Sequence, residues 1–201
     1  MSAVGMGGSL AASSASLTAL TVAVDGAREY GAEVKVFNLR ELNLPMYSPE
    51  ADAAPRAAIE LCDAVHAAQG LMWSSPLYHG TVSGAFKNAI DWLQLLHDRT
   101  PPYLTDKVDG LISTAGGTHG LQAVNTMEFA VSALRGWAVP LVLPIPQAWR
   151  VFKDGRVLDS RIEQQLRALG HELARTAQWF GATQLTTAEA ALVEGDVEPL
   201  Q

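Results

Sequence analysis

The amino-acid sequence predicts an α/β protein built on a doubly wound parallel sheet with helices on both faces. Strand-like and helix-like segments alternate along most of the 201 residues, as they do where crossover helices join parallel strands. Two strand-like segments, at 70–74 and 110–114, are apolar runs, which indicates strands covered on both faces. A third, at 32–39, alternates apolar and polar residues and therefore predicts an edge strand with one wet side.

The first half of the chain is expected to supply three strands and two helices. A short apolar start at 4–6 predicts the first strand, and a Gly/Ser/Ala-rich turn separates it from the first helix. Pro55 suits the opening turn of the second helix, which leads into the strand at 70–74. The residues at helical spacing are Leu17, Leu20, Val24 and Ala27 in the first helix, and Ile59, Cys62, Val65 and His66 in the second.

The second half of the chain is expected to supply the remaining helices, two strands and a hairpin. A helix over 84–97 precedes the second apolar strand, and a further helix ends at Gly136. The segment 139–146 predicts the fifth strand, and Asp154-Gly155 between short apolar runs indicates a β-hairpin. The apolar positions of the two later helices are Val124, Met127, Val131 and Leu134, then Ile162, Leu166, Leu169 and Leu173.

These elements favour the flavodoxin-like strand order 2-1-3-4-5, with the alternating second strand at an edge and the two apolar strands inside. In such a sheet the loops after strands one, three and four meet at one crevice. We expect a single domain over residues 1–180. The acidic segment 181–201 shows no clear period, and we expect a mobile tail or an arm that docks on a partner subunit.

Composition excludes several classes of protein. A net charge of −7 argues against a nucleic-acid partner, because phosphate backbones bind clustered Lys and Arg. No apolar run approaches the roughly 20 residues that span a bilayer, and residues 1–27 lack the basic residue of a secretory signal. The single cysteine, Cys62, cannot form an internal disulfide and suits a reducing compartment. We therefore expect a cytoplasmic protein without a membrane partner.

The first of the three loops, "GGSLAASSAS" at 7–16, predicts a phosphate site. Backbone N–H groups at a helix N-terminus bind anions, and Ser9, Ser14 and Ser16 each add a hydroxyl donor. The loop has neither a P-loop lysine nor the G-x-G-x-x-G pattern. A loop without a basic residue suits a phosphate monoester better than a polyphosphate, and an ordinary helix cap is the alternative of about equal weight.

The second loop, "SSPLYHGTVSG" at 74–84, can lie against a flat ligand. Gly80 and Gly84 allow close approach of the backbone, and Tyr78 and His79 can stack on an aromatic ring or bond to it. Taken alone, an aromatic pair on a loop more often packs within the protein.

The third loop, "STAGGTHGLQAV" at 113–124, leaves backbone N–H groups bare at three glycines, 116, 117 and 120. Such groups suit the polar edge of a heterocycle. His119 reads more readily as a surface histidine than as a contact of a second substrate.

Side chains that perform chemistry are scarce. No Ser or Cys forms a triad-like pattern with His and an acid, and the histidines lack metal-ligand spacing, so we expect no metal site and no catalytic side chain. Cys62 lies inside a helical pattern and is expected to be a small buried apolar group. A pocket rich in backbone donors and poor in acids and bases indicates that a bound cofactor carries the reaction.

Three segments together resemble the NADPH-dependent FMN reductase family, which includes related quinone, azo-dye and chromate reductases. They are "GGSLAASSASLTAL", "SSPLYHGTVSGAFKNAIDWL" and "STAGGTHGLQAVNTMEFAVSALRGWAVP". The resemblance extends over about residues 4–180, and its S-P-x-Y…G…K-N-A-I-D-W part is the most specific. It implies a flavodoxin-like fold, non-covalent FMN, a homodimer or dimer of dimers, and hydride transfer from NADPH or NADH to the flavin.

The resemblance also implies three sets of cofactor-binding residues. The phosphate set is Ser9, Ser14 and Ser16 with the intervening backbone of Ala11 and Ala15. The isoalloxazine set is Pro76, Leu77, Tyr78, His79 and Gly80, and the set at the other ring edge is Thr114, Ala115, Gly116 and Gly117. Family members often carry arginine at the position of Ala11 and glycine at that of Ser13. Loss of one charge-assisted contact lowers affinity roughly ten- to a hundred-fold.

The helix over 84–97 is apolar around about 220° of its circumference, which is wider than one face of a sheet needs. Trp92, Leu95 and Leu96 form a second stripe that would be an exposed patch unless covered. We expect this stripe to be an interface in a homodimer or homotetramer, with the loop of Tyr78 at its edge. Burial beneath the 98–106 loop of the same chain is the alternative.

Three functions compete. The first is an enzyme in which NAD(P)H reduces bound FMN, which then reduces a flavin, quinone or similar small-molecule acceptor. The second is a flavodoxin-like electron carrier without its own NAD(P)H reductase activity, and the third is a relative that has lost FMN. The sequence leaves open the acceptor and the choice between NADPH and NADH, for which Arg99, Arg135 and Arg150 are equal candidates to bind a 2′-phosphate.

Overall fold

The computed structural model describes the backbone of residues 1–194 and the side chains of residues 1–181. Five parallel strands form the sheet, in the order β2-β1-β3-β5-β6. They are β1 (Ser2–Gly7), β2 (Glu33–Asn38), β3 (Gly70–Tyr78), β5 (Val108–Thr114) and β6 (Trp137–Ile145). The short β4 (Thr81–Val82) pairs antiparallel with the end of β3. Counted along the main path, this is the predicted order 2-1-3-4-5, and the flavodoxin-like prediction is confirmed.

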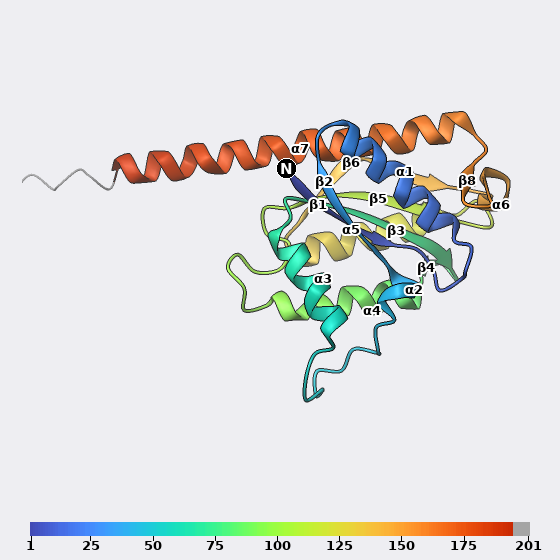
Figure 1. The fold of residues 1–201 in the computed structure, drawn as a ribbon, viewed down its shortest axis with the longest axis horizontal. Helices are drawn as coiled ribbons and strands as arrows, with labels where there is room; N and C mark the ends of the chain where they lie inside the picture. Colours follow the sequence, from blue (N-terminus) through green and yellow to red (C-terminus); the bar gives the residue numbers. More distant parts are fainter. Residues whose placement is uncertain (195–201) are drawn as a thin grey trace, which may run out of the picture.

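Helices cover both faces of the sheet (Figure 1). On one face lie α1 (Ala15–Glu29) and α7 (Ser160–Glu194), and on the other lie α3 (Arg56–Ala67), α4 (Gly84–Trp92) and α5 (Leu121–Ala133). Three short helices, α2 (Leu39–Leu42), η1 (Leu93–Leu96) and α6 (Ala148–Val151), lie in the connections. The predicted hairpin is present as β7 (Phe152–Lys153) and β8 (Arg156–Val157).

The burial of each strand follows its sequence pattern. All of β5 is buried, as is β3 up to Pro76. In β2, Glu33 and Lys35 are exposed and Val34 and Val36 are half-buried, since the strand is at the sheet edge. The predictions for the central and edge strands are therefore confirmed.

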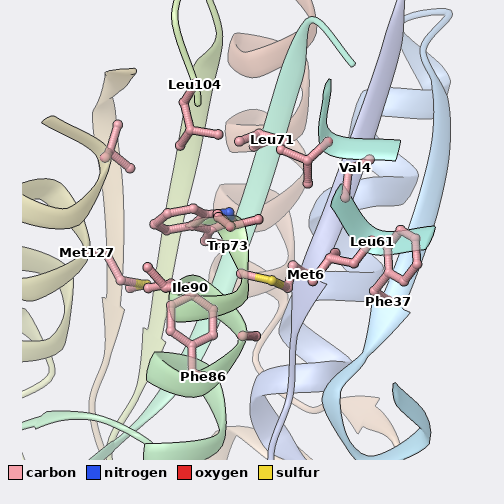
Figure 2. Close-up of a cluster of buried hydrophobic side chains, with 14 of the residues drawn as sticks. Val4, Met6, Phe37, Leu61, Leu71, Trp73, Phe86, Ile90, Leu104 and Met127 are labelled. Carbon is pink, nitrogen blue, oxygen red and sulfur yellow. The ribbon is translucent and has the colours of Figure 1, made fainter. Parts of the chain in front are cut away.

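The larger core lies between the sheet and the α3, α4 and α5 face (Figure 2). Trp73 on β3 meets Phe86 on α4 edge-to-face, with ring centroids 5.6 Å apart. Both side chains are almost fully buried, and full burial of such a side chain stabilises the fold by about 1.5–3 kcal/mol. Leu71 and Leu111 extend this packing along β3 and β5. This core thus fixes the N-terminal end of α4, which directly follows the second of the three predicted site loops.

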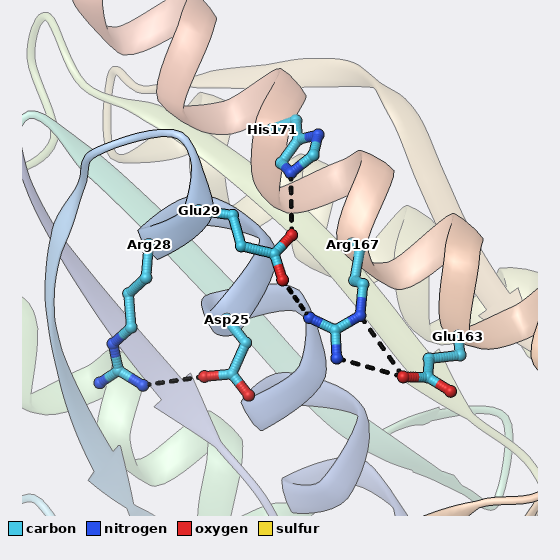
Figure 3. Close-up of polar contacts among 6 residues, drawn as sticks. All are labelled: Asp25, Arg28, Glu29, Glu163, Arg167 and His171. Carbon is cyan, nitrogen blue, oxygen red and sulfur yellow. Dashed lines mark hydrogen bonds and ion pairs between the residues drawn. The ribbon is translucent and has the colours of Figure 1, made fainter.

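On the opposite face, α1 and α7 cross in very close contact. A Cβ on Gly170 would lie 2.0 Å from the carbonyl oxygen of Ala23, and a Cβ on Gly26 would lie 2.3 Å from that of Arg167. Arg167 on α7 pairs with Glu29 on α1 and with Glu163 one turn earlier, and His171 approaches Glu29 at 3.2 Å (Figure 3). Two glycines thus allow backbone contact, and a surface ion-pair cluster lines its edge.

The helix over 84–97 is packed differently from the prediction. It is α-helical to Trp92 and continues as a 3-10 turn, and both Trp92 and Leu96 are buried within the chain. The indole N–H of Trp92 donates to the carbonyl oxygen of Pro45 at 2.9 Å, and Tyr47 packs edge-to-face on the indole. The prediction that Trp92 and Leu96 form a stripe left open for a second chain is wrong, because both side chains are buried within the chain and the irregular segment after α2 covers Trp92. Only Leu95 of that stripe is exposed.

Two helices also differ in detail from their sequence patterns. In α3 the buried face consists of Ala58, Leu61, Cys62 and Val65, while Ile59 is exposed. The last helix, α7, continues to Glu194 and includes residues 181–194, for which a mobile tail or a docking arm was expected. Docking of this segment on a partner stays a prediction, and residues 195–201 lie outside the described residues. Within the described chain, no helix combines the length and the apolarity needed to cross a bilayer.

Candidate functional site

The loop after β1 leaves the sheet through two glycines that the geometry requires. A Cβ on Gly7 would lie 2.3 Å from the carbonyl oxygen of Ser74, and Gly8 has a φ of 100°. The N–H of Gly8 donates to that same oxygen at 3.1 Å. The loop is therefore held against the end of β3, where a side chain would push it away.

The three serines of this loop come together at the N-terminus of α1. Ser14 is the N-cap, and its hydroxyl accepts from the N–H of Leu17 at 3.2 Å and from that of Ser9 at 3.1 Å. The hydroxyl of Ser16 lies 3.1 Å from that of Ser14, and all three serines are buried. The N–H groups of Ala15 and Ser16, in the first turn, have no acceptor within the helix. A helix cap and N–H groups without an intrahelical acceptor thus occur in one loop.

The loop after β3 is a tight hairpin. Tyr78 pairs with Thr81 across it, and His79 and Gly80 have φ values of 50° and 87°. Two successive positive φ angles are typical of a two-residue hairpin turn. The ring of Tyr78 is half exposed. Ser83 then caps α4 by accepting from the N–H of Phe86 at 3.2 Å, so the hairpin is fixed at both ends.

The loop after β5 is fixed at its base and open at its tip. The N–H of Ala115 donates to the carbonyl oxygen of Ile145 at 2.9 Å, and Thr114 and Ala115 are buried. Gly116 and Gly117 are exposed, and a Cβ at either glycine would meet no atom within 4 Å. The carbonyl oxygen of Ala115 accepts from the N–H of Ala148 at 2.9 Å, so the base of the loop is held by the chain itself, while the two glycines leave open space beside it. His119 is also exposed.

The three loops lie along one edge of the sheet. Gly7 pairs with Ser74, and Pro76 pairs with Thr114, so β1, β3 and β5 end side by side. The structure thus brings together the three sets of residues that the sequence singled out. This edge is the one at which ligands bind in open α/β sheets.

Two cavities flank the first loop. One of about 260 Å³ separates the start of α1 from the β7–β8 hairpin and is lined by Ser13, Ala15, Thr18, Ala148, Trp149, Phe152, Lys153, Asp154 and Gly155. The other, of about 200 Å³, is largely apolar and is lined by Leu10, Leu39, Asn43, Leu44, Met46, Gly84, Ala85 and Asn88. The sequence predicted the hairpin but did not assign it to the site. The sequence did contain a signal for this assignment: the hairpin follows the last strand, so it starts from the same carboxyl edge of the sheet as the three loops.

The three arginine candidates for a nucleotide phosphate are not equally placed. Arg99 and Arg135 precede β5 and β6, at the amino edge of the sheet, and Arg99 pairs with Asp63 at 2.6 Å. Arg150 follows β6 at the carboxyl edge and lies over the ring of Trp149, 4.7 Å from its centroid. Of these three, Arg150 alone is at the edge that carries the loops.

The single cysteine, Cys62, is chemically inert. Burial raises the pKa of the Cys62 thiol to about 12, with a smaller contribution from Asp63, and its sulfur contacts the carbonyl oxygen of Trp92 at 3.3 Å. Cys62 is therefore a neutral buried thiol, as the sequence indicated. Among the described residues, no three His, Cys, Asp or Glu side chains are grouped to hold a metal ion.

The sheet order and the three loops at its carboxyl edge define a flavodoxin-like protein. The sequence model of the family "NADPH-dependent FMN reductase" matches residues 1–150. The chain belongs to this family.

Curated relatives carry names from two groups of reductases. The chain is 33% identical over 128 residues to the NADPH-dependent FMN reductase ArsH of Acidithiobacillus ferrooxidans, a match that covers 64% of this chain and 52% of the relative. It is 29% identical over 147 residues to the FMN-dependent NADPH-azoreductase of Staphylococcus aureus, covering 70% and 75%. An NADPH azoreductase of a Bacillus species is 27% identical, covering 71% and 74%. The matches to ArsH of A. ferrooxidans and of Rhizobium meliloti span 52% and 59% of those relatives' lengths.

Solved structures share the fold at low sequence identity. The flavoenzyme NAD(P)H:(acceptor) oxidoreductase FerB of Paracoccus denitrificans superimposes with a TM-score of 0.69 and 21% identity, over 90% of this chain and 97% of that one. RosB, solved with a bound flavin-derived intermediate, superimposes with a TM-score of 0.72 and 15% identity, over 100% and 90%.

Proposed function

We propose that the protein is an NAD(P)H-dependent, FMN-containing oxidoreductase. The observation that carries the proposal is the cluster of buried serines at the N-terminus of α1, on the same sheet edge as the open glycine loop. Family membership supplies the cofactor class. When bound, FMN supplies the capacity to accept and donate a hydride.

The first loop fits the phosphate of FMN. A monoester at the start of α1 would meet the N–H groups of Ala15 and Ser16, which have no intrahelical acceptor, and the hydroxyls of Ser9, Ser14 and Ser16. The backbone of Ala11 completes the loop, and its N–H is tied to the hydroxyl of Ser9 at 3.3 Å. These donors are already oriented by hydrogen bonds to one another, which reduces the ordering that binding requires.

The other two loops fit the flavin ring. We assign one side to Pro76, Leu77, Tyr78, His79 and Gly80, and the other edge to Thr114, Ala115, Gly116 and Gly117. The assignment rests on the hairpin turn that fixes the first set and on the free space beside the two glycines of the second. A rigid ring needs such preformed walls, because most of its binding free energy comes from buried flat surface.

The protein contributes positioning rather than acid–base chemistry. Among the described residues, the three loops bring only Tyr78, His79 and His119 as titratable groups. Holding the nicotinamide against the flavin and limiting access of water are the contributions left to the chain. The apolar cavity beside Leu10 and Met46 suits a flat acceptor such as a quinone, a second flavin or an azo compound.

NADPH is the reductant that the names of the curated relatives support. Arg150 is the arginine best placed for a 2′-phosphate, since it is at the loop edge of the sheet. The same names argue against an electron carrier that lacks reductase activity. The pre-oriented serines argue against a relative that has lost FMN.

The protein is proposed to act in the cytoplasm, as a homo-oligomer. The exposed apolar side chains of Leu121 and Phe129 on α5 support an oligomer, because such side chains favour burial against a second chain. Light scattering of the wild type and of Phe129→Glu tests this, and a monomeric wild type would refute it.

One experiment separates the three functions. The purified protein is freed of flavin, titrated with FMN, and then titrated anaerobically with NADPH and with NADH while the absorbance of oxidised flavin is followed. Binding of FMN followed by bleaching supports the proposal. Binding without bleaching by either nucleotide would make the protein an electron carrier, and absence of FMN binding would refute both.

A further inference from the structure

The proposed phosphate loop has no positive charge of its own. Neither residues 7–16 nor the rest of the first 27 residues include Lys or Arg. A phosphate monoester carries about −1.5 to −2 charges at neutral pH. The serine hydroxyls and N–H groups of the loop are neutral donors, so a counter-charge has to come from another part of the chain.

The β7–β8 hairpin is held beside this loop. Phe152 is buried in the same core as Ala19 of α1, with Ala15 packed against that core. Asp154 and Gly155 form the turn with φ values of 50° and 72°, typical of a two-residue hairpin. The hairpin is thus a rigid element whose position relative to the start of α1 is fixed by packing.

Lys153 lines the cavity between the two elements. Ser13, Ala15 and Thr18 line it from the α1 side, and Lys153 lines it from the hairpin side. Within the described side chains, no ion pair holds the ammonium of Lys153. By contrast, the guanidinium of Arg150 lies over Trp149, and Arg156 lies outside this cavity, although both Lys153 and Arg156 line the next one.

We propose that Lys153 supplies the counter-charge for the FMN phosphate and so performs, from the hairpin, the task of a basic residue that the loop lacks. The inference rests on the proposed function, in which the loop holds that phosphate. Asp154 lines the same cavity and opposes Lys153, so the affinity for FMN is set by both residues. Removing the charge of Lys153 should therefore weaken FMN binding, and removing the charge of Asp154 should strengthen it.

The test compares flavins with and without the phosphate. Dissociation constants of FMN and riboflavin are measured by quenching of flavin fluorescence, for the wild type and for Lys153→Gln. We expect Lys153→Gln to weaken FMN binding about tenfold, because Lys153 is exposed and its charge is partly screened. Riboflavin binding should not change. Asp154→Asn, which retains a residue favoured in this turn, should tighten FMN binding and leave riboflavin binding unchanged.

Arg156→Gln is the matched control, since it removes the same charge from the same hairpin outside the cavity. It should leave both dissociation constants unchanged. Adding Ala11→Arg to Lys153→Gln should restore FMN affinity by placing a charge in the loop itself.

Three results would overturn the inference while leaving the proposed function intact. They are unchanged FMN affinity in Lys153→Gln, equal losses in Lys153→Gln and Arg156→Gln, and equal losses of FMN and riboflavin in Lys153→Gln. Failure of the wild type to bind FMN would instead refute the proposed function, and the role of Lys153 with it.

Discussion

Substituting Gly170 by alanine probes the close contact between α7 and α1. The added Cβ would lie 2.0 Å from the carbonyl oxygen of Ala23 and 2.5 Å from the amide nitrogen of Ala27. Both are backbone atoms of α1, so neither can move aside by a rotamer change, and the two helices would have to separate. Alanine favours a helix by about 1 kcal/mol over glycine, but overpacking costs typically about 1–3 kcal/mol. We expect a net loss of up to about 2 kcal/mol.

Urea denaturation followed by circular dichroism measures this loss as a lower midpoint with an unchanged slope. Gly181→Ala is the matched control, because Gly181 is on the same helix and its Cβ would meet only the side chain of Gln69, at 3.9 Å. The control should be neutral or more stable by up to about 1 kcal/mol. If Gly170→Ala were as stable as Gly181→Ala, the close crossing of α1 and α7 would be refuted.

Two further predictions concern a buried acid and the open loop. Burial raises the pKa of Asp109 well above its usual value, against a weaker backbone contribution from Trp73, and neither carboxylate oxygen has a hydrogen bond of good geometry. The folded chain therefore retains a proton on Asp109 that the unfolded chain releases above about pH 4. As a result the free energy of unfolding falls as pH rises, by up to about 1.4 kcal/mol per pH unit. The fall ends once the pH has passed the pKa of Asp109 in the folded state. Urea midpoints of Asp109→Asn should lack this decline, and parallel pH profiles of mutant and wild type would contradict the assignment. Gly117→Val should leave the urea midpoint unchanged, because a Cβ at this position meets no atom within 4 Å. If Gly117 borders the flavin ring, the same substitution should weaken the binding of FMN and of riboflavin alike, by about tenfold. Unchanged binding of both flavins would show that Gly117 is not part of the site.

Much of the candidate site was predictable because its signals are local. Ser14 caps α1 through contacts within three residues, and Asp154-Gly155 forms the turn that its composition favours. The burial of Trp92 was not predictable, since it depends on Pro45, 47 residues earlier, in a segment without periodicity. The role proposed for Lys153 was not predictable for the same reason. The hairpin and the first loop are far apart in the sequence, and they become neighbours only in the folded chain.

The last helix shows the limit of periodicity in another way. Its apolar stripe, which includes Leu166, Leu169 and Leu173, packs on the sheet and made the helix recognisable. The sequence of 181–194 shows no clear period but contains several alanines, which favour helical backbone. The absence of a clear period in this segment therefore gave no signal for the helical backbone that continues to Glu194.

The sequence by itself determined the strand order, the edge at which the loops gather and the residue types in those loops. Hydrophobic pattern decides which strands are buried, and the parallel connections then bring the carboxyl ends together. Only the tertiary structure decided that Trp92 is covered by its own chain, that two glycines let α1 and α7 touch, and that Lys153 borders the proposed phosphate loop. These features depend on contacts between segments distant in sequence, whose proximity exists only after the sheet and its helices have packed.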